Sequence, residues 1–241
     1  MILNIQPDER SFDHEAARQI YAQIASKPNS VIGLSTGRTT GNLHRAFARM
    51  AREGSLDLSR VTFFGQDEIV GVPRTYAGAC YEMLRSELIG DLGIPQDRFL
   101  MPPTGWDGAE EALRTFTETL QARGGIDLIL LGLGENGHLG FNQPGSPFGG
   151  TARIATVGPE LDARVRRELA LGPDAPLGGA TLGLRDVMHA RRILLVAKGA
   201  HKAAIVREIL RGPVTEAVPG SVLQLHPACE DLLDAEAAAL L

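Results

Sequence analysis

The sequence predicts an α/β fold: a doubly wound, mainly parallel sheet with helices on both faces, of the Rossmann-like kind. Short apolar runs recur along the chain, and segments with helical spacing alternate with them. Each apolar run ends in glycine or small polar residues, as buried parallel strands do where they enter loops. No repeat and no shift in composition divides the chain, so residues 1–241 are expected to form a single domain.

The elements are placed by their periodicity. Buried strands are expected at residues 31–34, 61–64, 126–131 and 193–197, and further strands near 99–101 and 221–225. Apolar residues at helical spacing indicate helices within residues 16–24, 43–50, 76–84 and 204–209. The stretches 145–150 and 171–179 are expected to be long loops inside the same domain.

Composition limits the classes of partner. The 24 Lys and Arg residues against 29 Asp and Glu give a net charge of −5, so no global basic field exists for nucleic acid or an anionic membrane. An anionic ligand must therefore be held by a local cluster. The amino-terminal residues do not resemble a signal peptide, and we expect a soluble cytoplasmic protein. Cys80 and Cys229 are expected to be buried free thiols, and scattered histidines predict no metal site.

A small-residue turn follows the first predicted strand. It contains Ser35, Thr36, Gly37, Arg38 and Thr39 and leads into a helix. Glycine lets the backbone approach an anion closely, and the first amides of a helix favour phosphate. The spacing is not that of a Walker A loop. A polar turn with a threonine cap is the alternative interpretation.

Two adjacent carboxylates, Asp67 and Glu68, follow the second predicted strand. Neighbouring residues at a strand end point apart, so one can face a ligand while the other contacts protein. A helix cap or a surface turn is the alternative interpretation of this pair. Its place at the ligand-binding edge of a parallel sheet favours a functional role.

A glycine-rich segment, 132–137, follows the third predicted strand and matches G-x-G-x-x-G. Further glycines and a proline after Gly137 argue against the helix that a dinucleotide site needs, so nicotinamide binding is not expected. The glycines instead let the chain turn beneath His138, a candidate for proton transfer. After the fourth strand, Lys202 opens the last helical segment, where a cation is favoured only if an anion lies nearby.

Taken together, these motifs resemble one family, that of the glucosamine-6-phosphate deaminases and 6-phosphogluconolactonases. The similarity runs in order from about residue 31 to about residue 230, through segments 33–37, 64–73, 126–142, 199–202 and 223–227. Phe141 and Asn142, followed by Pro144 and Gly145, resemble the deaminase branch. That resemblance implies isomerisation and deamination of an amino sugar 6-phosphate to fructose 6-phosphate and ammonia, without a metal or organic cofactor.

The resemblance also implies roles for individual residues. Asp67 would move a proton between C2 and C1 with Glu68 beside it, and His138 would carry the ring-oxygen proton. Phosphate would lie on the Ser35–Thr39 turn, with Gly137 also at the site, and would be held by Lys202 and an arginine. Alignment favours Arg167 for that arginine, with Arg164 and Arg166 left open, and Arg153 also matches an arginine near the family's site.

The chain departs from the family pattern around the histidine. The well-known deaminases carry acidic groups two residues before and five residues after it, and this chain has Asn136 and Gln143. An amide can orient an imidazole but supplies no negative charge to stabilise imidazolium. Glu135 is a possible substitute, and the segment 149–152 also differs from the family pattern.

The sequence is therefore consistent with three alternative functions. The first is a deaminase of an amino sugar phosphate, and the second is a 6-phosphogluconolactonase-type hydrolase. The third is a catalytically weak sugar-phosphate-binding regulatory protein, suggested by Gln143. The expected partner is a small sugar phosphate, and a homo-oligomer remains possible.

Overall fold

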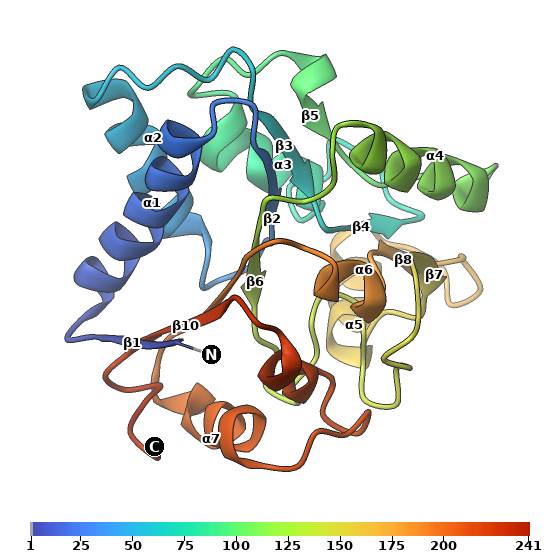
Figure 1. The fold of residues 1–241 in the computed structure, drawn as a ribbon. Helices are drawn as coiled ribbons and strands as arrows, with labels where there is room; N and C mark the ends of the chain where they lie inside the picture. Colours follow the sequence, from blue (N-terminus) through green and yellow to red (C-terminus); the bar gives the residue numbers. More distant parts are fainter. Residues whose placement is uncertain (1) are drawn as a thin grey trace.

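The computed structural model describes residues 2–241 and contains a wholly parallel seven-stranded sheet (Figure 1). The strand order is β1-β10-β9-β6-β2-β3-β5. In chain order the strands are β1 Ile2–Gln6, β2 Val31–Leu34, β3 Thr62–Gly65, β5 Phe99–Leu100, β6 Leu128–Gly132, β9 Ile193–Ala197 and β10 Cys229–Asp234. The α/β fold class is confirmed, and the four apolar runs and the segment near residue 99 form strands of this sheet.

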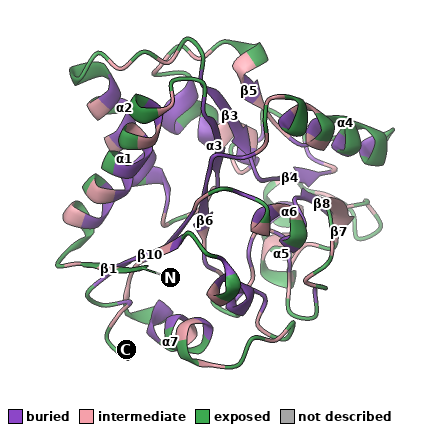
Figure 2. Ribbon diagram, viewed as in Figure 1, coloured by how far each residue is buried: buried purple, intermediate pink, exposed green. Residues whose placement is uncertain are grey.

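Helices cover both faces of the sheet, which explains why its strands are apolar on both sides (Figure 2). One face is covered by α1 Glu9–Ser26, α2 Gly41–Glu53 and α3 Cys80–Leu84, the last continued by a π-helical turn at Arg85–Ile89. The other face is covered by α4 Ala109–Ala122, α6 Leu184–Met188 and α7 Ala203–Arg211. The sheet is therefore doubly wound, as the sequence predicts.

Three of the four expected helices lie within α1, α2 and α7, whereas the segment 76–84 is helical only from Cys80 onward. Tyr76 lies in a turn, in which its amide donates to the Pro73 carbonyl at 2.9 Å. The helix begins where the amides of Cys80 and Tyr81 donate to the Glu68 carboxylate. A contact from another strand thus sets this helix start, and helical periodicity cannot reveal it.

A second, antiparallel sheet lies beside the first and was not expected from the sequence. Its order is β4-β8-β7, with β4 Asp67–Val70, β7 Arg153–Ala155 and β8 Gly178–Thr181. The chain crosses from β3 into β4 at Gln66, so Asp67 and Glu68 begin a new strand. The loop expected at 171–179 is wrong at its end, because residues 178 and 179 belong to β8. The glycines of this strand have little intrinsic strand preference, so the sequence does not predict it. A small apolar cluster joins β4 to helix α5, Pro159–Glu168, through Ile69 and Val165.

The strand expected at 221–225 is wrong, because these residues belong to a 3₁₀ helix, Pro219–Leu225. The Gln224 amide donates to the carbonyls of Ile209 and Gly212, which satisfies acceptors at the end of α7. The true strand follows immediately as β10. Acidic residues interrupt its apolar pattern, and for this reason periodicity does not identify it.

The connections place one edge of the main sheet at a topological switch point. From β2 the chain continues to β3 and β5 on one side, whereas β6, β9 and β10 lie on the other. Loops that leave neighbouring strands β2 and β6 therefore diverge at this edge, where open α/β sheets bind ligands. No helix among residues 2–241 has the length and apolar character needed to cross a membrane.

Candidate active site

The loop after β2 presents unused backbone donors. Within the part of the chain that the structure describes, the amides of Gly37, Arg38 and Thr39 have no hydrogen-bond acceptor. Gly37 has φ +143°, and a Cβ atom there would have open space around it. The Thr40 amide closes the turn on the Gly37 carbonyl at 3.2 Å, and α2 begins one residue later. Three free amides before a helix form an arrangement suited to an anion such as phosphate.

The two hydroxyl residues at the start of this loop face the protein. The Ser35 hydroxyl donates to the Leu130 carbonyl at 2.7 Å and so ties the loop to β6. The Thr36 hydroxyl donates to the Cys80 sulfur at 3.2 Å. Both residues belong to the turn that is expected to bind phosphate, and in this structure their hydroxyls hold the loop in place.

Glu68 is fully buried, and protein groups satisfy its carboxylate. It accepts hydrogen bonds from the amides of Ile69, Cys80 and Tyr81 at 2.8, 2.9 and 2.8 Å. Burial is the largest influence on its pKa and raises it, while these amides act in the opposite direction. Glu68 therefore anchors the start of α3 and does not face a ligand.

Asp67 points to the other side of β4, and no backbone amide of residues 2–241 donates to its carboxylate. It is 8% exposed, and burial, followed by the nearby Glu68 charge, raises its pKa to about 7. The Cys80 thiol donates to its Oδ1 at 3.6 Å. No cationic side chain among residues 2–241 forms an ion pair with it. A carboxylate with this pKa can both accept and return a proton near neutral pH.

The loop after β6 holds His138 against two glycines. A Cβ atom on Gly134 would lie 2.2 Å from the His138 ring, so only glycine leaves room for the imidazole. Gly137 has φ +83°, and its amide donates to the Gly134 carbonyl at 3.0 Å. Gly137 thus shapes the turn, and its amide is not free for the substrate. No helix follows, which agrees with the sequence argument against a dinucleotide site.

The imidazole is oriented by Asn136. The Asn136 side-chain oxygen lies 2.6 Å from His138 Nδ1, and the Asn136 amide nitrogen donates to Gln143 Oε1 at 3.1 Å. Because a carbonyl oxygen only accepts, Nδ1 carries the proton and Nε2 is left as an acceptor. Gln143 therefore acts on the imidazole through Asn136. Of the two amides that depart from the family pattern, Asn136 makes the direct contact with the ring.

Electrostatic effects on His138 favour its neutral form. Burial is the largest cause that lowers its pKa, and the Lys202 charge lowers it further. Glu135 acts in the opposite direction through its charge, but within residues 2–241 it forms no hydrogen bond to the ring. Glu135 thus replaces the missing carboxylates only at long range.

Gly140 brings the two reactive groups to one place. A Cβ atom on this residue would lie 3.0 Å from Asp67 Oδ2 and 2.9 Å from Thr181 Oγ1. Its φ of +57° also favours glycine. The loop that carries His138 therefore contacts the Asp67 carboxylate at Gly140, two residues after the histidine. Gln66 lies at the same contact, because its Nε2 would be 2.9 Å from that Cβ atom.

Lys202 supplies positive charge on the far side of His138. It is 8% exposed, burial lowers its pKa, and no carboxylate in residues 2–241 forms an ion pair with it. The loops after β2, β6 and β9 are neighbours because the strand order is β9-β6-β2. The free amides and Lys202 therefore lie on either side of the His138 loop.

The three candidate arginines of α5 differ in their contacts: Arg164 and Arg166 contact protein groups, and Arg167 contacts none within the described residues. Arg166 pairs with Asp162 at 2.8 Å and donates to the carbonyls of Gly172 and Ala175, so it is a structural brace. Arg164 interacts with the Tyr76 hydroxyl. Arg167 is exposed and forms no ion pair or hydrogen bond within the described chain, which leaves it available for a ligand.

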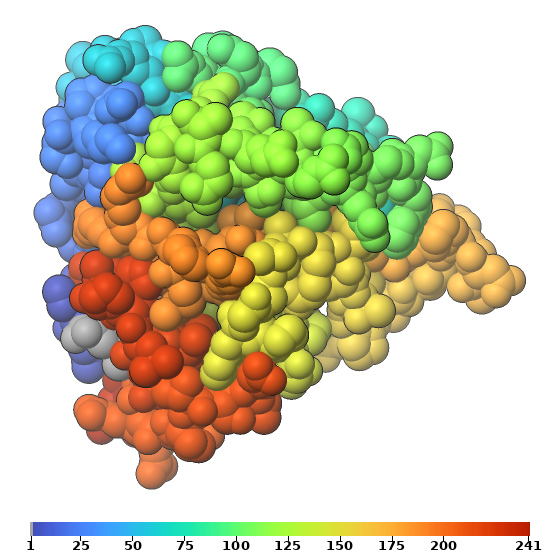
Figure 3. Space-filling view, turned by 45° about the vertical axis from the view of Figure 1, so that its right-hand side comes forward, coloured from blue at the N-terminus to red at the C-terminus, as the bar shows by residue number. Residues whose placement is uncertain are grey.

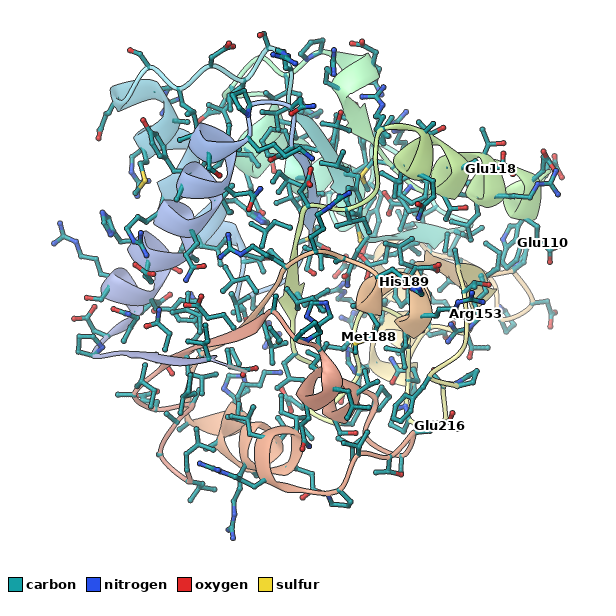
Figure 4. All side chains as sticks on the ribbon, viewed as in Figure 1. Glu110, Glu118, Arg153, Met188, His189 and Glu216 are labelled. Atoms are coloured by element: carbon teal, nitrogen blue, oxygen red, sulfur yellow. The ribbon has the colours of Figure 1, made fainter. Side chains whose placement is uncertain are left out.

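Arg153 braces the loop that follows His138. Its guanidinium donates to Asn142 Oδ1 at 2.8 Å and to Ser146 Oγ at 3.0 Å. It lies beside α6, the helix that carries Met188 (Figure 4). Around residue 150 this segment reaches the surface between α4 and the carboxyl-terminal part of the chain (Figure 3). The contacts of Arg153 with Asn142 and Ser146 use two of the five guanidinium N–H donors and hold the loop in place.

Sequence reasoning missed four residues that contact this site: Gln66, Cys80, Gly140 and Thr181. Gln66 and Gly140 adjoin recognised motifs, so their position along the chain was an available signal. Cys80 and Thr181 come from elements whose sequence separation from Asp67 hides the contact. A surface hollow lined from segments 51–59 and 91–95 lies at the opposite edge of the sheet and touches none of these groups.

Known proteins are similar to this chain over nearly its whole length. The profile of the glucosamine-6-phosphate isomerases and 6-phosphogluconolactonases matches residues 8–232. A glucosamine-6-phosphate deaminase of Alkaliphilus oremlandii is 30% identical over 241 residues, covering 100% of both chains. The enzyme of that name from Rhodopirellula baltica is 35% identical over 239 residues, 99% of this chain and 95% of the relative.

Solved structures show the same fold. A monomeric glucosamine-6-phosphate deaminase superposes with a TM-score of 0.91 at 28% identity, with all of both chains covered. A 6-phosphogluconolactonase from Trypanosoma cruzi superposes with a TM-score of 0.80 at 20% identity, covering 100% of this chain and 96% of that chain. At that identity the second likeness concerns the fold alone.

Proposed function

The chain belongs to the family of glucosamine-6-phosphate isomerases and 6-phosphogluconolactonases, and we propose on that basis that it is a glucosamine-6-phosphate deaminase. The single observation that carries the proposal is the contact of the Gly140 backbone with Asp67. It brings a carboxylate of pKa about 7 against the loop that carries a neutral histidine. Deamination of a cyclic aldose 2-amine needs two proton carriers, one for ring opening and one for isomerisation.

Phosphate binding comes first in this scheme. The dianion accepts hydrogen bonds from the amides of Gly37, Arg38 and Thr39 and is attracted by Lys202 and Arg167. These groups concentrate positive potential in a protein whose net charge is −5. Fixing the phosphate end places the other end of the sugar between His138 and Asp67.

Ring opening uses His138. Its Nε2 accepts the proton of the anomeric hydroxyl and returns it to the ring oxygen, and the C1–O5 bond breaks to give the aldehyde. Asn136 holds Nδ1 as the donor, so Nε2 starts as the free base. The ring nitrogen ends the step as it began.

Isomerisation uses Asp67. Its carboxylate removes the proton from C2 while a proton of the substrate's own ammonium group passes to O1, which gives the enolamine. Asp67 then delivers the C2 proton to C1, and the C2–N bond becomes an iminium. Water then adds to C2 and ammonia leaves, which gives the ketose phosphate. Burial of Asp67 shields the base from bulk water and strengthens its basicity relative to an ordinary aspartate.

The test is ammonia release from a panel of hexosamine 6-phosphates, with 6-phosphogluconolactone hydrolysis measured in parallel. We expect ammonia from glucosamine 6-phosphate and none from the Asp67→Asn variant, which cannot accept the proton. Lactone hydrolysis without ammonia release would replace the proposal with the hydrolase. Sugar-phosphate binding with neither product would replace it with the regulatory protein.

A further inference from the structure

A buried thiol connects the base to the anion-binding loop. The Thr36 hydroxyl donates to Cys80 Sγ at 3.2 Å, and the Cys80 thiol donates to Asp67 Oδ1 at 3.6 Å. Cys80 is 6% exposed, and burial followed by the Asp67 charge raises its pKa well above the ordinary value. The sulfur therefore keeps its proton and remains a donor throughout the working pH range.

The backbone fixes where this thiol lies. The Cys80 amide donates to Glu68 Oε1 at 2.9 Å, and the next amide along, that of Tyr81, donates to Oε2 at 2.8 Å. Glu68 is the residue after Asp67, so one dipeptide holds both the backbone of Cys80 and the group that its side chain contacts. This double attachment leaves the sulfur little freedom to move away from Asp67.

The other cysteine shows that burial alone does not produce this arrangement. Cys229 lies on β10, 1% exposed, among the apolar core residues on one face of the sheet. Within residues 2–241 its sulfur forms no hydrogen bond. Cys80 differs because its sulfur accepts one hydrogen bond and donates another, both to side chains at the candidate site.

We propose that Thr36 and Cys80 form a hydrogen-bond relay that positions the Asp67 carboxylate relative to the phosphate-binding loop. This inference rests on the proposed function, because that function supplies the phosphate that binds the loop and the sugar on which Asp67 acts. Thr36 directly precedes the free amides of Gly37, Arg38 and Thr39. When phosphate orders that loop, the Thr36 hydroxyl is fixed as well, and its hydrogen bond then fixes the position of the Cys80 thiol. Cys80 is thus a positioning residue for the base and does not itself touch the reacting carbons.

The relay makes a prediction about kinetics. Cys80→Ala removes the donor with little change in volume, and we expect kcat to fall by about threefold to tenfold with KM nearly unchanged. The acid limb of the pH profile moves upward, because Asp67 loses a donor that favours its ionised form. The other titratable group that acts on Asp67 is Glu68, which is unchanged in this variant.

Companion variants separate positioning from packing. Cys80→Ser retains a donor and should recover most of kcat and the wild-type acid limb, and Thr36→Val should shift both in the direction of Cys80→Ala. Thr36→Ser restores the hydroxyl and should restore the profile. If Cys80→Ala retains the wild-type kcat and acid limb, or if Cys80→Ser behaves like Cys80→Ala, the thiol merely fills space and the relay is wrong.

An infrared measurement tests the relay without turnover. In a Cys229→Ala background, the remaining S–H stretching band belongs to Cys80. We expect this band to shift as the pH passes through about 7, where Asp67 ionises, and to lose that shift in Asp67→Asn. An S–H band whose frequency changes neither with pH nor in Asp67→Asn would overturn the relay. A protein that shows the shift but releases no ammonia would instead keep the relay and overturn the proposed function.

Discussion

Replacing Asp67 by asparagine should stabilise the fold while removing the activity. The carboxylate has an ordinary pKa of 3.8 and a folded-state pKa of about 7, mainly because it is buried. The difference is about 3 pKa units, and at about 1.4 kcal/mol per unit the ionised group costs at most about 4 kcal/mol of folding free energy. The asparagine amide keeps part of a desolvation cost, so we expect a gain of about 2 kcal/mol.

The sign of the effect depends on pH. The folded state binds the Asp67 proton more tightly than the unfolded state, so this proton stabilises the fold at low pH. That contribution declines as the pH rises from about 4 to about 7 and is absent above the folded-state pKa. Wild type and Asp67→Asn should therefore have similar stabilities near pH 4, and the variant should be the more stable at about pH 8.5.

Asp231 provides a matched control for this measurement. It is 1% exposed on β10, and burial raises its pKa to about 7. Within residues 2–241, neither of its carboxylate oxygens has a hydrogen-bond partner. Asp231→Asn should give a similar stability gain in urea unfolding at about pH 8.5 and leave kcat unchanged, because it lies outside the candidate site. If Asp231→Asn is stabilised at that pH and Asp67→Asn is not, the argument that Asp67 is a desolvated base fails.

Three further substitutions examine the rest of the site. Gly140→Ala should lower kcat by at least about tenfold, because its Cβ would crowd Asp67 and the backbone has φ +57°; circular dichroism would check that the fold survives, and an unaffected kcat would refute the contact. Lys202→Ala should raise KM about tenfold to a hundredfold through loss of a charge-assisted contact, and unchanged inhibition by simple sugar phosphates would remove Lys202 from the phosphate site. Gln143→Glu should raise the pKa of His138 in an NMR titration through the intervening Asn136, and an unmoved titration would mean that Asn136 insulates the ring.

The parts of the fold that the sequence predicts are those dictated by local pattern. The strand at 193–197 is a run of five apolar residues, each buried, and its limits are as expected. Local pattern does not identify β4 and β8. Asp67 and Glu68 are typical of a polar turn, and Gly178 and Gly179 are typical of a loop. Their pairing depends on a register between residues more than a hundred positions apart, which periodicity does not encode.

The candidate site divides in the same way. Sequence position suffices to place Asp67 and His138 at one edge, because both follow strands of a parallel sheet. It does not distinguish the base from the anchor: Glu68 is recognised as an anchor only because two of its three amide donors come from α3. Nor does it settle Arg166, because two of its three partners are the carbonyls of Gly172 and Ala175, in a loop whose path sequence position does not reveal.

The amides beside His138 agree with the electrostatics of the whole site. A carboxylate partner stabilises imidazolium, whereas the Asn136 oxygen fixes the tautomer without adding charge. Burial and the Lys202 charge both lower the pKa of His138, so the surroundings already disfavour the cation. A neutral imidazole can still pass one proton from the anomeric hydroxyl to the ring oxygen, and it avoids placing a second cation beside Lys202. Gln143 is therefore consistent with the proposed mechanism, in which His138 stays neutral between steps and Asp67 holds the charge during proton transfer.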